Sequence, residues 1–253
     1  MGGLFGRLVV SAITDFVSWR MGLIVIGILY LAVGIAFFML LPKPKYQRQR
    51  QSGGLQLIKN FHTALANKKL LWIYLVAFLI MGSFVAVFNF ISYVLLAPPY
   101  SLSQTVVGLL FVVYLFGTFS STYMGRLSDQ HGNGRVLILG LLIMLTGGLL
   151  TLLQPLVFKF IGLAIFTFGM LGSHSVACGW VGKLNQGDKA QSSSMYMFFY
   201  YAGASSLGTL GGVFLESYGW SGVIGMVAAA VIICLLVVVR LELAVSQHLL
   251  WHH

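Results

Sequence analysis

Residues 70–125 read LLWIYLVAFLIMGSFVAVFNFISYVLLAPPYSLSQTVVGLLFVVYLFGTFSSTYMG and contain no charged side chain. This stretch is more than twice as long as the roughly 20 apolar residues that a helix needs to cross a bilayer. Pro98 and Pro99 lie at its centre, and a proline inside a helix removes a hydrogen bond and clashes with the preceding turn. The stretch therefore predicts two membrane-spanning helices joined by a short turn.

The rest of the chain has the same apolar character. Of the 253 residues, 58% are hydrophobic and only 8% are charged, whereas about a quarter of the residues in a soluble domain are charged. We therefore expect an all-α membrane protein with about eight transmembrane helices, the first of which contains Arg7. The predicted spans are 2–14, 21–41, 70–97, 105–125, 136–154, 160–181, 195–214 and 221–239.

The basic residues lie in the gaps between the apolar runs. The net charge is +10, but no basic polar face is present to favour a nucleic-acid partner. Residues 42–69 hold seven lysines and arginines, the loop at 98–104 holds none, and loops rich and poor in basic residues alternate after that. Since basic loops stay in the cytoplasm, we expect residues 42–69 and the C-terminus on the cytoplasmic side.

The long basic loop is the predicted boundary within the chain. Four apolar side chains recur at helical spacing between residues 55 and 65, which is typical of an amphipathic helix on the anionic inner leaflet. We expect two helices of one half at 1–42, a central loop with this helix at 43–69, and a six-helix half with a short cytoplasmic tail at 70–253.

An acidic residue four positions before a tryptophan occurs twice. Both copies, at 15–19 and 216–220, fall in a predicted outer turn between two spans. The matching positions favour two related halves, as in transporters built from parallel repeats.

The most specific motif is GRLSDQHGNGR at residues 125–135. Its glycines, Gly125 and Gly132, allow helix ends to pack closely, and Asp129 can lie near a helix N-terminus or pair with Arg126 or Arg135. Such a pair would act as a latch that holds one arrangement of the helices on the cytoplasmic side. The alternative interpretation is an ordinary polar turn.

This motif resembles the loop signature of the major facilitator superfamily, with Gln130 and Gly134 standing where basic residues are usual. The sequence GGLFGR at 2–7 resembles the end of a glycine-rich motif of the drug/proton antiporter branch. Three further segments are similar to the YnfM-type inner-membrane transporters of that branch: MGSFV at 81–85, HSVA at 174–177 and GTLGGVF at 208–214.

The resemblance implies helices five to twelve of a twelve-helix transporter in the inner (plasma) membrane, with the first four helices absent. It also implies secondary active transport of a small organic solute, by proton-coupled efflux through alternating access. Two alternatives remain open, a truncated remnant that does not transport and a half-transporter subunit that needs a separate N-terminal half. A membrane enzyme would need clustered catalytic residues, which the sequence does not show.

Five residues are candidates for the translocation path. His174 lies within a predicted span, where an ionisable side chain usually faces a cavity or a partner; it would bind substrate or take part in proton coupling, or it is a neutral histidine bonded to a neighbouring helix. Arg7 would attract an anionic group, or its side chain extends to the membrane surface. Asn89, Tyr93 and Tyr200 would contact the substrate or serve in packing.

The acidic residues offer no obvious proton carrier. All five fall at span ends or in loops, so proton coupling would depend on His174 or on residues outside this sequence, or would not occur. Cys178 and Cys234 lie in apolar runs without ligand spacing, and we expect neither a metal site nor a cofactor.

Overall fold

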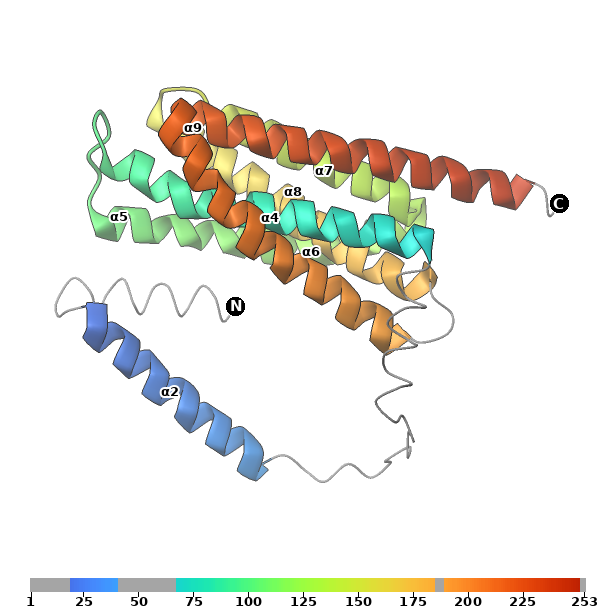
Figure 1. Cartoon of the computed structure of the whole chain (residues 1–253), viewed down its shortest axis with the longest axis horizontal. Coiled ribbons are helices and arrows are strands. Elements are labelled where there is room, and N and C mark those ends of the chain that lie inside the picture. The colour runs from blue at the N-terminus through green and yellow to red at the C-terminus, as the bar shows by residue number, and fades with distance from the viewer. Residues whose placement is uncertain (1–18, 41–66, 185–188, 251–253) are drawn as a thin grey trace.

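The computed structural model describes residues 19–40, 67–184 and 189–250, and all secondary structure in these ranges is helical (Figure 1). Pro98, Pro99 and the residues beside them form the turn predicted from the uncharged stretch. The all-α prediction is confirmed in the described residues. The elements are α2 (Trp19–Leu40), α4 (Lys68–Leu96), α5 (Gln104–Leu109), the 3-10 helix η1 (Leu110–Val113), α6 (Tyr114–His131), α7 (Asn133–Leu150), α8 (Leu156–Leu184) and α9 (Lys189–Leu250).

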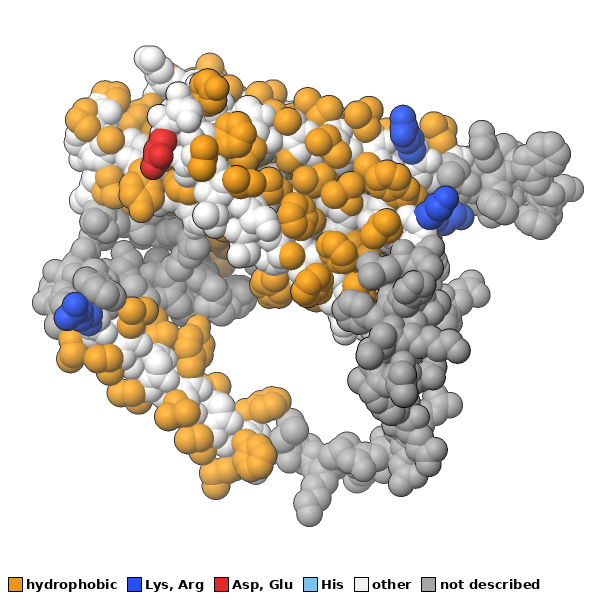
Figure 2. Space-filling view, viewed as in Figure 1, with side chains coloured by type: hydrophobic (Ala, Val, Ile, Leu, Met, Phe, Trp, Pro, Cys, Tyr) orange, Lys and Arg blue, Asp and Glu red, His pale blue; other side chains and the backbone are white. Residues whose placement is uncertain are grey.

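Five of these helices are long and apolar enough to cross a membrane: α2, α4, α7, α8 and α9. The span predicted at 105–125 is formed by α5, η1 and α6 in succession, with the 3-10 turn interrupting the α-helical hydrogen bonding. Figure 2 shows apolar side chains over the middle of the bundle and charged ones at its ends. This distribution fits a lipid environment.

Helix α9 contains the last two predicted spans. It runs for 62 residues and is broken at Gly219, whose φ of 64° and ψ of −157° are not helical. A residue with a side chain is disfavoured at such a positive φ. Residues 189–218 and 220–250 therefore form two legs that meet at Gly219, which we call the elbow, and the chain reverses there (Figure 1).

Glycines bring α7 and α8 into close contact. A Cβ atom at Gly147 would lie 2.2 Å from the backbone nitrogen of Phe166, and one at Gly169 would lie 2.3 Å from that of Met144. No side chain fits at such distances, so the two backbones touch directly. The same device joins α4 to the first leg of α9, where a Cβ atom at Gly203 would overlap the carbonyl of Phe78.

An aromatic cluster fills the centre of the bundle. Phe84 and Phe88 of α4 contact Tyr114 of α6 at ring-centroid distances of 5.4 and 5.1 Å. Phe166 of α8 stacks on Phe84 at 6.2 Å. Aromatic pairs of this kind contribute about 0.5–1.5 kcal/mol beyond their buried area, so three helices are held together at this point.

Helix α2 stands apart from the other helices (Figure 1). Nearly all of its apolar side chains are exposed, and Ile26 is intermediate. The predicted helix at 2–14 and the predicted amphipathic helix of the central loop lie outside the described residues. The proposed division at 43–69 therefore stays a prediction.

Candidate functional site

His174 of α8 lies against two tyrosines from the first leg of α9. Its Nδ1 atom is 2.9 Å from the hydroxyl of Tyr196, and its ring centroid is 4.4 Å from that of Tyr200. The histidine is half-buried, whereas both tyrosines are buried. Depending on the tautomer of the neutral ring, either the Nδ1–H group donates to the tyrosine oxygen or the tyrosine hydroxyl donates to Nδ1.

Three tyrosines of the first leg of α9 divide between two faces of the helix. Tyr196 and Tyr200, four residues apart, stack at 6.2 Å on the face toward α8. Tyr201 is 64% exposed and points away from the histidine. Helical spacing alone predicts this division, because residues four positions apart, such as Tyr196 and Tyr200, share a helix face. Tyr201, five positions after Tyr196, lies on a different face. Tyr196 is therefore a site residue that was not among the five path candidates.

The other predicted path residues do not join this cluster. Asn89 and Tyr93 lie in the second half of α4, where both are exposed on the bundle surface, Tyr93 by 65%. The Tyr93 ring contacts Phe90 on its own helix at 6.3 Å. Arg7 lies outside the described residues.

The predicted latch residue Asp129 has a partner in the structure, and it is neither Arg126 nor Arg135. Its carboxylate is 3.1 Å from the ammonium group of Lys183, at the end of α8. Lys183 also donates to the side-chain oxygen of Asn133 in α7, again at 3.1 Å. One lysine thus joins the end of α6, the start of α7 and the end of α8. We call this region the Asp129 end of the bundle.

Arg135 forms a second ion pair at the Asp129 end. Its Nε atom is 3.9 Å from a carboxylate oxygen of Glu242, on the second leg of α9. Gly132 has φ of 91° between α6 and α7, which explains why a glycine is needed in this turn. Gly125, by contrast, has room for a side chain, because a Cβ atom there would make only an ordinary 3.6 Å contact with Ser175.

A buried lysine occupies the opposite end of the bundle. Lys159 precedes the predicted span at 160–181 by one residue, but it lies in the first turns of α8 and is only 4% exposed. It donates to the carbonyl of Thr151, which also accepts from the indole of Trp220 at 3.1 Å. The rings of Tyr100 and Trp220 face its ammonium at 5.8 and 5.9 Å. We call this region the Lys159 end.

The charge on Lys159 is compensated by these partners. A cation near an aromatic face is stabilised by about 2 kcal/mol when water is excluded, and the Thr151 carbonyl satisfies one donor. The residues come from the turn after α4, the end of α7, the start of α8 and the elbow of α9. Four segments therefore meet around one cation.

The fold and the motif agree with a comparison of whole sequences. The profile of the Major Facilitator Superfamily matches residues 73–248. The chain belongs to this superfamily. The match covers α4, from its second turn, through most of α9, so it includes the latch motif and the histidine cluster.

Curated relatives extend the similarity beyond residues 73–248 to most of the chain. The chain is 41% identical over 242 residues to the inner membrane transport protein YnfM of Escherichia coli. It is 40% identical over 235 residues to the uncharacterized MFS-type transporter YybF of Bacillus subtilis, and 35% identical over 242 residues to an uncharacterized transporter of Buchnera aphidicola. These alignments cover 96%, 93% and 96% of the chain, respectively.

The chain spans less than three fifths of these relatives. The alignments cover 58% of YnfM, 58% of YybF and 59% of the Buchnera protein. Multi-pass membrane insertion follows from the family and from the apolar helices. Among the described residues, no three histidine, cysteine or acidic side chains come together to form a metal site.

Proposed function

We propose that this chain is a secondary transporter that moves a small organic solute out of the cell in exchange for protons, by alternating access. The observation that carries the proposal is the contact of half-buried His174 with Tyr196 and Tyr200 within a transporter fold. An ionisable group inside a membrane bundle generally marks a substrate or proton path.

The proposed role of His174 is to accept and release a proton during transport. Its imidazole has one hydrogen bond to Tyr196 and one aromatic neighbour in Tyr200. The aromatic wall suits an organic solute, and the ring nitrogen not bonded to Tyr196 is available for a proton or a substrate polar group. Asn89 and Tyr93, which face outward from α4, would meet the solute only where a second half covers that face. The role proposed for Arg7, which lies outside the described residues, is to attract an anionic group.

The proposed mechanism is alternating access with the Asp129 end in the cytoplasm. The ion pairs of Asp129 with Lys183 and of Arg135 with Glu242 join α6, α7, α8 and α9. Both pairs are exposed enough for water to replace them, so they can break and reform. We propose that they stabilise one arrangement of this half while it rocks against the other half.

An efflux assay tests this function. Cells that carry the chain are loaded with ethidium, a fluorescent hydrophobic cation, and dye loss is followed with and without a protonophore. We expect faster loss than in cells without the chain, and we expect the protonophore to abolish the difference. The His174→Gln variant should lose the coupled component, whereas Tyr201→Phe, altered on the outward face, should retain it.

The half-transporter alternative is favoured by the exposed apolar surface of α2. In this case the chain would transport only together with a separate chain that contains the first four helices. The corresponding segment of YnfM, expressed as a second polypeptide, should then co-purify with this chain and restore efflux. Efflux by neither the chain alone nor the pair would contradict transport and would favour the remnant.

A further inference from the structure

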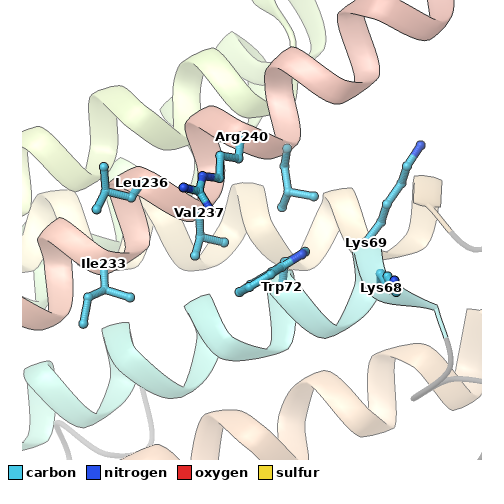
Figure 3. Close-up of a pocket in the computed structure, with 8 residues that line it drawn as sticks. Lys68, Lys69, Trp72, Ile233, Leu236, Val237 and Arg240 are labelled. Atoms are coloured by element: carbon cyan, nitrogen blue, oxygen red, sulfur yellow. The ribbon is translucent and has the colours of Figure 1, made fainter.

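We propose that a groove between α4 and the second leg of α9 binds an anionic phospholipid of the membrane leaflet at the Asp129 end. The groove has a volume of about 520 Å³. Its mouth carries Lys68, Lys69 and Arg240, and its floor is apolar, with Trp72 of α4 facing Ile233 and Val237 of α9 (Figure 3). A phosphodiester at the mouth and an acyl chain along the floor would match both parts.

The three cations lack an acidic partner on these two helices. In the described part of the chain neither lysine is ion-paired, and the first turn of α4 contains no acidic residue. Glu242 follows Arg240 by two residues, but its carboxylate is engaged by Arg135 of α7. The positive charge at the mouth is therefore uncompensated within the described residues.

The start of α4 adds to this positive charge. Lys68 and Lys69 lie in the first turn of a 29-residue helix, whose N-cap Asn67 accepts from the backbone N–H groups of Lys69 and Leu70. The N-terminus of a helix carries a partial positive charge and attracts anions. The two lysines at the start of α4 and Arg240 on α9 therefore line the same groove from its two walls (Figure 3).

The apolar floor favours a lipid over a free phosphate. Ile233 and Arg240 are seven residues apart on one helix leg, which separates them by about 10 Å along the axis. The floor therefore extends from the charged mouth toward the bilayer centre for about two helical turns. Trp72 beside the basic residues is typical of the membrane interface. A free phosphate would leave this floor uncovered.

Native mass spectrometry of the purified full chain tests the proposal with two lipids of equal chain length. The detergent-solubilised protein is mixed with equal amounts of dioleoylphosphatidylglycerol, which is anionic, and dioleoylphosphatidylcholine, which is zwitterionic. We expect the first retained lipid to be phosphatidylglycerol, preferred over phosphatidylcholine by about 100-fold, because each of the three basic residues at the mouth contributes roughly a factor of five toward an anionic headgroup.

Two double variants carry the same total charge and separate the groove from the rest of the surface. Lys69→Gln/Arg240→Gln removes two mouth cations and should weaken phosphatidylglycerol binding by about 25-fold. Arg126→Gln/Lys189→Gln removes two exposed cations elsewhere and should change it by less than about 2-fold. Equal losses in both variants, or no preference in the parent chain, would overturn the proposal.

A third arm distinguishes the lipid from its headgroup. Glycerophosphoglycerol, the deacylated form of phosphatidylglycerol, should not displace the lipid, because it cannot cover the apolar floor. Displacement at equal concentration would show that the site recognises a free phosphodiester, and the lipid assignment would be wrong. None of these outcomes depends on transport activity, so the lipid site and the proposed function are tested separately.

Discussion

The hydroxyl of Tyr196 is the hydrogen-bond partner of the His174 ring. The histidine lies at membrane depth, and its Nδ1 atom has the Tyr196 hydroxyl at 2.9 Å as its partner. The hydrogen bond keeps the ring in one orientation against Tyr200. The same bond would be present in a histidine with a purely structural role, so stability and transport have to be measured separately.

We expect Tyr196→Phe to lower the free energy of unfolding by only about 0.6 kcal/mol, the average value for a hydrogen bond between membrane helices. The phenylalanine retains the ring contact with Tyr200. Thermal unfolding in detergent measures the loss, with Tyr201→Phe as the matched control. If Tyr196 positions a proton-carrying His174, the pH profile of efflux should change in Tyr196→Phe and not in the control. An unchanged profile would leave only a structural role.

Trp220 is the second residue whose substitution is informative. Its indole donates to Thr151 and covers the buried ammonium of Lys159. Trp220→Phe keeps an aromatic face but loses the donor, and we expect a loss of about 1 kcal/mol of unfolding free energy. Trp220→Leu also removes the aromatic ring that faces the Lys159 ammonium, and we expect the unfolding free energy to fall by about 3 kcal/mol. Thermal unfolding of both variants checks this order, and the reverse order would refute the role assigned to the ring.

At the scale of elements, adjacent glycines in α7 give a sharp comparison. A Cβ atom at Gly147 would lie 2.2 Å from the backbone of α8, whereas one at Gly148 would lie 3.6 Å from the Phe166 ring. We expect Gly147→Ala to destabilise the bundle by about 1–3 kcal/mol, because the helices must separate. Gly148→Ala should be neutral or slightly stabilising. Thermal unfolding of the two variants distinguishes them, and equal effects would contradict the close contact.

The ion pair between α6 and α8 should affect the opening of the Asp129 end to water more than it affects the free energy of unfolding. Asp129 and Lys183 are 74% and 55% exposed, so Asp129→Asn should cost about 0.5 kcal/mol or less. The half-buried thiol of Cys178 lies five residues before Lys183 on α8 and reports on access to this end. We expect faster maleimide labelling of Cys178 in Asp129→Asn. Exchanging the two charges, in Asp129→Lys/Lys183→Asp, should restore the original rate, and buried Cys234 is the internal control.

At the scale of the whole molecule, the alternation of basic loops predicts the orientation in the membrane. A fluorescent protein fused at the C-terminus should fluoresce, because that end is predicted to be cytoplasmic. Alkaline phosphatase fused after Pro155, in the turn between α7 and α8, should be active because that turn is predicted to be outside. The same two reporters exchanged between these positions should both be silent. An active phosphatase at the C-terminus would invert the proposed orientation.

Much of the architecture could be predicted from the sequence, and the reason is physical. A lipid-facing helix needs a long apolar run, so the helices α2, α4, α7 and α8 begin and end within a few residues of the predicted spans. The 3-10 turn of η1 could not be predicted, because the run that contains it is apolar throughout. The elbow at Gly219 falls inside the predicted outer turn at 216–220.

The candidate residues could be found in the sequence more easily than the residues that they contact. His174 is a candidate because an ionisable side chain within a span is unusual, Asp129 because it belongs to the loop motif, and Tyr200 because its ring suits either a hydrophobic substrate or packing. Lys183, Glu242 and Tyr196 come from other helices, and Lys183 lies 54 residues from Asp129. No periodicity links residues on different helices. The burial of Lys159 could not be predicted, because the aromatic rings that face its ammonium come from Tyr100 and Trp220, far away in the sequence.

The two ends of this bundle are fastened by interactions of different kinds. Water-accessible pairs join the helices around Asp129, and a cation shielded by aromatic rings joins them around Lys159. Dissolved salt screens the first kind strongly and the second weakly. Moderate increases in ionic strength should therefore weaken the contacts between helices at the Asp129 end and leave those at the Lys159 end almost unchanged.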